Sequence, residues 1–142
     1  MATEILVNDG GAPARVLNLA VANVDLEAGL VVDINSSGKI IAAADDQTGG
    51  TNKAQAVALG VLLVDATAGD PTSIITGKGI VLNVQSVAGL TVGEELVVDN
   101  AGMLEHSGNI DTDRIFGIAL GSTFAGTDSG GTATNFTKVL VL

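Results

Sequence analysis

The chain has 142 residues, a length that fits one domain, and its formal net charge is −10. Hydrophobic residues make up 46% of the sequence but aromatic residues only 2%, so small aliphatic side chains must form the core, and a core of this kind favours oligomerisation. The lack of cysteine excludes disulfides and thiolate chemistry, and the acidic charge disfavours direct contact with nucleic acid or an anionic membrane.

Short runs rich in β-branched residues recur along the chain with glycines between them, which is typical of strands joined by turns. The expected strands, in chain order, are Ile5–Val7, Arg15–Val24, Leu30–Ile34, Lys39–Ala43, Ala56–Val64, Ser73–Thr76, Gly79–Val84, Glu95–Asp99, Met103–His106, Ile115–Leu120 and Thr137–Leu142. One short helix or turn is expected around Gln85–Leu90. Residues 15–142 are therefore predicted to form one all-β domain, a small antiparallel barrel or sandwich.

The first fourteen residues are expected to form an extended N-terminal arm. Ile5, Leu6 and Val7 are a strand-forming triplet that Gly10, Gly11 and Pro13 separate from the body. A strand of three residues is not stable alone in water, so the arm needs a partner. Two arrangements are open: the arm adds to a sheet edge of a neighbouring subunit or of another protein, or it pairs with its own domain. In the first arrangement, Arg15 joins the triplet as a contact residue.

Two segments, Ala44–Lys53 and Gly126–Asn135, are polar and rich in Gly and Thr, and they are expected to be loops. The chain also contains an internal near-repeat. Gly29-Leu-Val-Val-Asp33 is followed by a glycine turn at Gly38, and Gly93-Glu-Glu-Leu-Val-Val-Asp99 by one at Gly102. In each copy a further strand with a central glycine follows, and an apolar strand, Ile80–Val84 or Lys138–Leu142, closes the copy. The repeat predicts two related β-units within one domain.

No pattern in the sequence indicates catalysis or a metal site. The single histidine, His106, is next to Ser107, and adjacent strand residues point to opposite faces. The acidic pairs, of which Asp111/Asp113 is nearest to a calcium-loop fragment, lack the remaining ligands around a glycine. No phosphate-binding loop string occurs. The prediction is a protein that is not an enzyme, with no cofactor and no metal.

Residues 59–142 resemble the capsid decoration (cement) proteins of tailed phages. The matching motifs, in order, are Leu59-Gly60-Val61, Asp65–Asp70, Gly77–Val81, Val92–Asp99, Gly102, Asp113–Ala119 and Lys138–Leu142. Two features depart from the family pattern. Leu96–Val98 are aliphatic where the family often has aromatic residues, and the loop at residues 44–52 is longer than usual.

The resemblance implies a β-tulip-like fold and a homotrimer on the outer surface of the virion, at three-fold and pseudo-three-fold positions. The implied partner is the major capsid protein, and the implied role is to stabilise the expanded, DNA-filled head after synthesis in the host cytoplasm. The alternative is a non-catalytic β-domain of a tail, fibre or cell surface that binds a receptor or glycan. Surface aromatic residues would favour the alternative, and the sequence has few aromatic residues of any kind.

Overall fold

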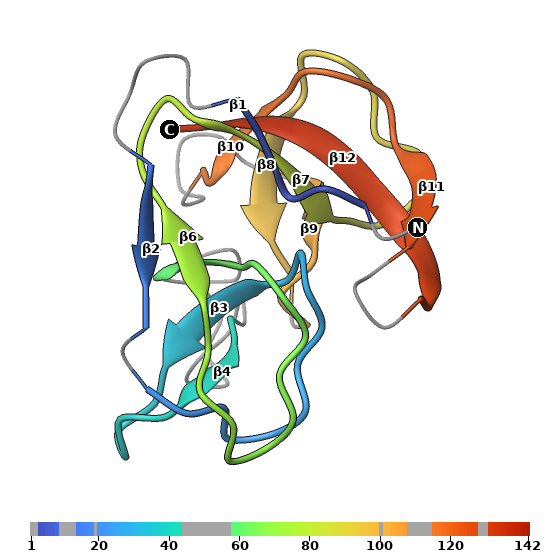
Figure 1. The fold of residues 1–142 in the computed structure, drawn as a ribbon. Helices are drawn as coiled ribbons and strands as arrows, with labels where there is room; N and C mark the ends of the chain where they lie inside the picture. The colour runs from blue at the N-terminus through green and yellow to red at the C-terminus, as the bar shows by residue number, and fades with distance from the viewer. Residues whose placement is uncertain are drawn as a thin grey trace.

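The computed structural model describes residues 3–8, 14–18, 20–43, 58–99, 101–107, 115–127 and 131–142, which form strands and turns and contain no helix (Figure 1). The strands are β1 Leu6–Asn8, β2 Arg15–Leu17, β3 Val31–Ile34, β4 Ile40–Ala42, β5 Gly60–Leu62, β6 Ile74–Thr76, β7 Val81–Gln85, β8 Glu95–Val98, β9 Leu104–His106, β10 Gly117–Ala119, β11 Phe124–Thr127 and β12 Ala133–Val141. The predicted all-β fold is confirmed.

The strands form two open sheets, and neither of them closes into a barrel. The seven-stranded sheet has the order β1-β7-β12-β10-β8-β9, with β11 also paired to β12, and the five-stranded sheet has the order β2-β6-β5-β3-β4. All pairs of named strands are antiparallel. In Figure 1 the long β12 arches over the upper part of the molecule, and β3 and β4 lie in the lower part.

The two sheets repeat one strand order. Strands β2 to β6, which we call unit 1, are arranged as β2-β6-β5-β3-β4. Strands β7 to β12, which we call unit 2, are arranged as β7-β12-β10-β8-β9, with β11 as an addition. Each unit thus places its first strand beside its last and ends in the hairpin of its second and third strands. The internal near-repeat seen in the sequence therefore corresponds to two units of equivalent topology.

The matching hairpins, β3–β4 and β8–β9, fix the alignment of the two units. Asn35 Oδ1 accepts hydrogen bonds from the backbone N–H groups of Ser37 (3.0 Å) and Lys39 (2.9 Å). Asp99 Oδ1 accepts the same two bonds, from Ala101 (2.8 Å) and Met103 (3.0 Å). Asn35 is therefore equivalent to Asp99. The sequence alignment, which matched Asp33 with Asp99, was wrong by two residues because it followed the identical letters rather than the turn.

Gly60 and Gly117 are equivalent positions where one strand must pass close to the next. A Cβ atom on Gly60 would lie 2.5 Å from the carbonyl oxygen of Ile75, and one on Gly117 would lie 2.5 Å from Val139 Cγ1 and would also clash with the carbonyl oxygen of Leu140. Both glycines belong to the middle strand of their unit, β5 or β10. The glycine motifs of the sequence thus mark a strand packed too tightly for any side chain.

The core has two parts, and both are almost entirely aliphatic. The larger part joins the two units: it includes Val31, Val61 and Ile75 from unit 1 and Leu96, Leu104 and Val139 from unit 2, together with the fully buried Phe136. The smaller part lies on the other face of unit 1, where the segments around Leu26 and Ala66 cover the sheet; its remaining members are Ala22, Val32, Ile40, Leu62 and Ile74.

Of the short helix or turn expected around Gln85–Leu90, the structure has the turn, at residues 88–89, after Gln85 ends β7 and Ser86 bridges to Leu104. Two other sequence predictions were wrong or partly wrong. Part of the expected loop Gly126–Asn135 belongs to β11 and β12, which pair with each other. The strand at Val81–Gln85 opens unit 2 instead of closing unit 1, which ends at β6. The expected loop Ala44–Lys53 lies outside the described residues.

Candidate partner-binding site

The N-terminal segment pairs with its own domain. Strand β1 lies at the edge of the seven-stranded sheet, antiparallel to β7, with Leu6 opposite Leu82. Ile5 is 4% exposed and belongs to the larger core, Leu6 is half-buried against that core, and Val7 is 41% exposed. Of the two arrangements that the sequence left open, the structure has the intramolecular one. Contact of these residues with another protein stays a prediction, and Val7 is the member of the triplet that is accessible for it.

Hydrogen bonds fix the whole length of this segment. The backbone N–H of Asn83 donates to the carbonyl oxygen of Ile5 (2.8 Å), and Asn83 Nδ2 donates to that of Glu4 (2.8 Å). Thr3 donates its N–H to the carbonyl oxygen of Thr127 (2.6 Å) and accepts a bond at Oγ1 from the N–H of Thr127 (2.9 Å). Strand β1 is therefore an edge strand of the seven-stranded sheet, and hydrogen bonds also hold Thr3, Glu4 and Ile5, which precede it.

Arg15, the fourth predicted contact residue, lies apart from the triplet in the strand order. It opens β2 at the edge of the five-stranded sheet, opposite Thr76, and its side chain is exposed. The next residue, Val16, is 50% exposed although it lies directly opposite the buried Ile75. Each sheet thus ends in an edge strand from the N-terminal part of the chain, and each edge strand carries one accessible valine.

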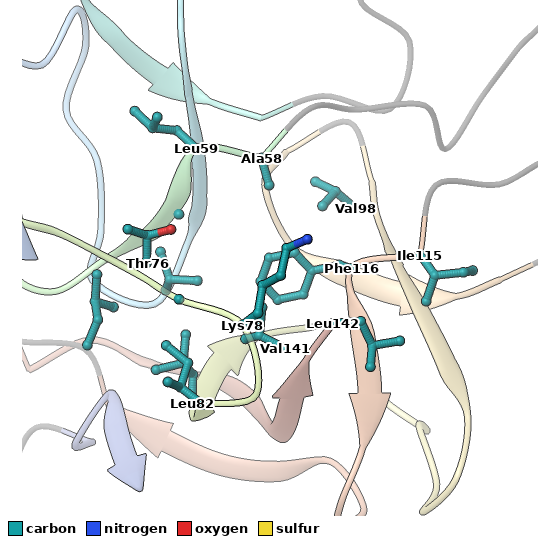
Figure 2. Close-up of a pocket in the computed structure, with 15 residues that line it drawn as sticks. Ala58, Leu59, Thr76, Lys78, Leu82, Val98, Ile115, Phe116, Val141 and Leu142 are labelled. Atoms are coloured by element: carbon teal, nitrogen blue, oxygen red, sulfur yellow. The ribbon is translucent and has the colours of Figure 1, made fainter. Parts of the chain in front are cut away.

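An apolar pocket of about 360 Å³ lies between the two units. Unit 1 contributes Val61 and Ile75, and unit 2 contributes Leu82, Val98, Phe116 and Val141. Figure 2 shows the side chain of Lys78, from the link between the units, lying in front of the Phe116 ring. The lining offers shape and apolar surface, with Thr76 and Lys78 as its polar side chains. Such a site can bind an apolar group, and the described residues that line it include no pair of groups for acid–base chemistry.

The acidic residues hold turns. Asp25 Oδ1 accepts the N–H of Ala68 (2.9 Å), Asp65 Oδ1 accepts that of Ala28 (2.7 Å), and Glu94 Oε2 accepts that of Thr91 (3.0 Å). Among the described residues, no three His, Cys, Asp or Glu side chains gather in a way that could hold a metal ion. The pairs Asp45/Asp46 and Asp111/Asp113 lie outside those residues.

His106 ends β9, where it is exposed and lies opposite Leu96. The described part of the chain has no helix long and apolar enough to span a membrane. No protein-family model matches the chain, and the search of curated proteins finds no match. The resemblance to capsid decoration proteins therefore rests on the motifs themselves.

Sequence reasoning missed Asn18 and Asn83. Asn83 holds β1, and Asn18 follows β2 at the edge of the other sheet, where its Oδ1 accepts a hydrogen bond from Ser73 Oγ (3.0 Å). A signal for both was present, because Val16-Leu17-Asn18 recurs as Val81-Leu82-Asn83. Three identical residues of common types are not evidence of a repeat by themselves. They become evidence only when the strand order shows that the two copies occupy equivalent positions.

Proposed function

We propose that this chain is a structural, non-catalytic capsid decoration protein. In this proposal it binds the outer surface of an icosahedral phage capsid as a trimer, at three-fold and pseudo-three-fold positions, contacts the major capsid protein, and stabilises the expanded, DNA-filled head. The observation that carries the proposal is the order of the family-like motifs from Leu59 to Leu142.

The places of these motifs in the fold support the proposal. Gly60 and Gly117 lie in the two equivalent middle strands, and Gly93 and Gly102 are turn residues with φ of 89° and 77°. The motifs are thus the parts that build the two units, as expected if the resemblance reflects a shared architecture. They do not form a site for chemistry.

The surface also has groups that suit binding to the capsid protein. Val7 and Val16 are accessible on the two edge strands, and edge strands carry unpaired backbone groups that can extend a sheet into a partner. The net charge of −10 keeps such a protein off the packaged nucleic acid, so binding would take place on the protein shell.

Co-sedimentation with purified expanded heads tests the proposal. The chain should bind at a saturating ratio of three copies per three-fold site and raise the temperature at which heads release DNA. Val7→Asp should weaken binding, because it places a charge on the β1 edge, whereas Val24→Asp is the matched control, since Val24 is 48% exposed but lies outside the strands. Point variants are preferable to deletion of residues 2–12, because deletion would also remove the buried Ile5.

Failure to bind heads would overturn the proposal. Saturable binding to a glycan or a receptor preparation, without binding to heads, would favour the alternative of a tail, fibre or cell-surface module. Light scattering at micromolar concentration tests the trimer separately: a monomeric mass would contradict it, and a trimer would be expected to bury at least about 1,000 Å² for each pair of subunits.

A further inference from the structure

The equivalence of the two units places the same three residues at two sheet edges. Val16 is opposite Ile75 in unit 1 as Val81 is opposite Leu140 in unit 2, and the next pairs, Leu17 with Ile74 and Leu82 with Val139, also match. Strands β2 and β7 are therefore the same strand of the two units, and both have the sequence Val-Leu-Asn at residues 16–18 and 81–83.

In unit 2 the outer edge of this strand is occupied. Strand β1 pairs with β7, and Asn83 holds it through two bonds of 2.8 Å, from its backbone N–H to Ile5 and from its side-chain amide to Glu4. The pairing shows what a Val-Leu-Asn edge binds within this molecule. It binds an extended antiparallel segment that has apolar side chains and backbone carbonyl groups available as acceptors.

In unit 1 the same edge is open among the described residues, because β2 is the last strand of its sheet. Val16 and Asn18 are exposed. Ser73 Oγ donates to Asn18 Oδ1 (3.0 Å), which fixes the carboxamide by its oxygen and leaves the amide nitrogen to donate elsewhere. The equivalent nitrogen of Asn83 is the one that holds β1.

We propose that the outer edge of β2, over Arg15–Asn18, binds an extended segment of another protein, which adds to the five-stranded sheet as β1 adds to the seven-stranded sheet. The expected segment is antiparallel to β2, has apolar side chains, and presents backbone carbonyl groups to the N–H and the side-chain amide of Asn18. Where the proposed function holds, which this choice of partner rests on, that protein is the capsid shell protein.

The number of strands argues against the β1 strand of a second copy of this chain as the source. Each chain carries two Val-Leu-Asn edges and one β1 strand. A β1 strand donated to the β2 edge of a neighbour would leave the β7 edge of its own chain open. Exchange of β1 between copies would therefore always leave one of the two edges of each chain unpaired. A strand from a different protein fills the edge of β2 and leaves β1 in place.

The test uses the full chain and a peptide with the sequence of residues 2–9 (ATEILVND) as the probe, because this peptide contains β1, Leu6–Asn8, which pairs with the Val-Leu-Asn edge of β7. Titration followed by amide NMR should shift the signals of Arg15–Asn18 and leave those of Val81–Asn83 unchanged. Asn18→Ala should weaken binding about fivefold to tenfold, as expected for one lost hydrogen bond. Val16→Lys should weaken it further, because an edge lysine opposes strand addition.

Asn23→Ala is the matched control, since Asn23 is an exposed asparagine of the same unit away from the β2 edge, and it should bind the peptide as the unchanged chain does. A thermal melt of each variant checks that the fold is retained. Three results would overturn the inference: no saturable binding, shifts at Val81–Asn83 in place of Arg15–Asn18, or self-association of the chain that Val7→Asp, a substitution at the exposed valine of β1, abolishes.

The peptide experiment needs no phage heads, so it separates this inference from the proposed function. A chain that binds the peptide at β2 but does not bind heads keeps the inference and overturns the function. A chain that binds heads but does not bind the peptide at β2 keeps the proposed function and overturns the inference.

Discussion

Units 1 and 2 share a strand order but turn opposite faces of their sheets toward the larger core. In unit 1, Val31, Val61 and Ile75 face the larger core, and Val32, Leu62 and Ile74 on the other face pack under that unit's own loops. In unit 2 the residues equivalent to the second set, Leu96, Ala119 and Val139, belong to the larger core. One topology has thus been placed in two environments.

The two units differ in sequence where those environments differ. Val31 is fully buried, whereas its equivalent Glu95 is half-buried and acidic. The turn residues are alike: Gly38 and Gly102 have the same φ of 77°. Backbone geometry is set by the fold and is common to both units, whereas the polarity of each strand position follows what covers it. Paired substitutions at equivalent or neighbouring sites can therefore test how far the two units act alike.

The largest effect is expected at Phe136, because it belongs to the core that joins the units. It is fully buried, and a Cβ atom on Gly29 of unit 1 would lie 2.7 Å from its Cε1. Phe136→Ala should lower the free energy of unfolding by about 3–5 kcal/mol in a denaturant titration. Phe124 stacks on it at 6.1 Å but is 38% exposed, so Phe124→Ala should cost much less. Equal losses would show that the units do not share a core.

A smaller effect is expected from the hairpin glycines. Both have a positive φ, so alanine at either position carries a left-handed backbone cost of about 1–2 kcal/mol. Gly38 has open space around it, but a Cβ atom on Gly102 would lie 2.6 Å from the carbonyl oxygen of Val31. Gly102→Ala should therefore destabilise the protein by about 1–3 kcal/mol more than Gly38→Ala in thermal or chemical unfolding. Equal losses of stability for the two variants would mean that the β8–β9 turn is not packed closely against Val31 of unit 1.

The smallest effect concerns two buried threonines, Thr72 and Thr137. Thr72 Oγ1 donates to the carbonyl oxygen of Ala20 (2.8 Å), whereas Thr137 Oγ1 bonds to the hydroxyl groups of Ser86 (2.8 Å) and Thr123 (3.2 Å). Thr72→Val should cost about 1 kcal/mol, and Thr137→Val about 1–3 kcal/mol, because it removes a partner from the buried Ser86. The order of the two losses, measured by urea titration, is the test, and the reverse order would contradict it.

Most strands could be predicted from the sequence, because aliphatic β-branched runs bounded by glycine have few alternatives. Strand β11 could not, since Phe124–Thr127 contains Ala and Gly and is held by its pairing with β12, a contact that local propensity does not encode. Around Gln85–Leu90, where a short helix or turn was expected, the structure has the turn, and tertiary contacts hold it: Ser86 bridges to Leu104, and Leu90 is buried in the larger core.

The candidate site was harder to predict than the fold. Ile5, Leu6 and Val7 were predicted to form a strand that needs a partner; the observed strand is Leu6–Asn8, one residue further along, and nothing in the triplet specifies which edge it joins. That choice depends on Asn83, far along the chain, whose backbone and side chain both reach β1. Arg15 could be assigned to a strand, whereas its place at an open edge follows from the order of the sheet.

Unit 1 ends with β6 at Thr76 and unit 2 begins with β7 at Val81, so residues 77–80 are the whole connection between them. Because this link is short, the facing surfaces of the two units are at a high effective concentration. They also avoid the free-energy cost of lost translational and rotational freedom that two separate molecules would have on association, about 4–15 kcal/mol. The face between the units can therefore contain a pocket of about 360 Å³ and still hold the two units together. A single proteolytic cut within residues 77–80 would make that same face bimolecular, and its occupancy would then depend on protein concentration.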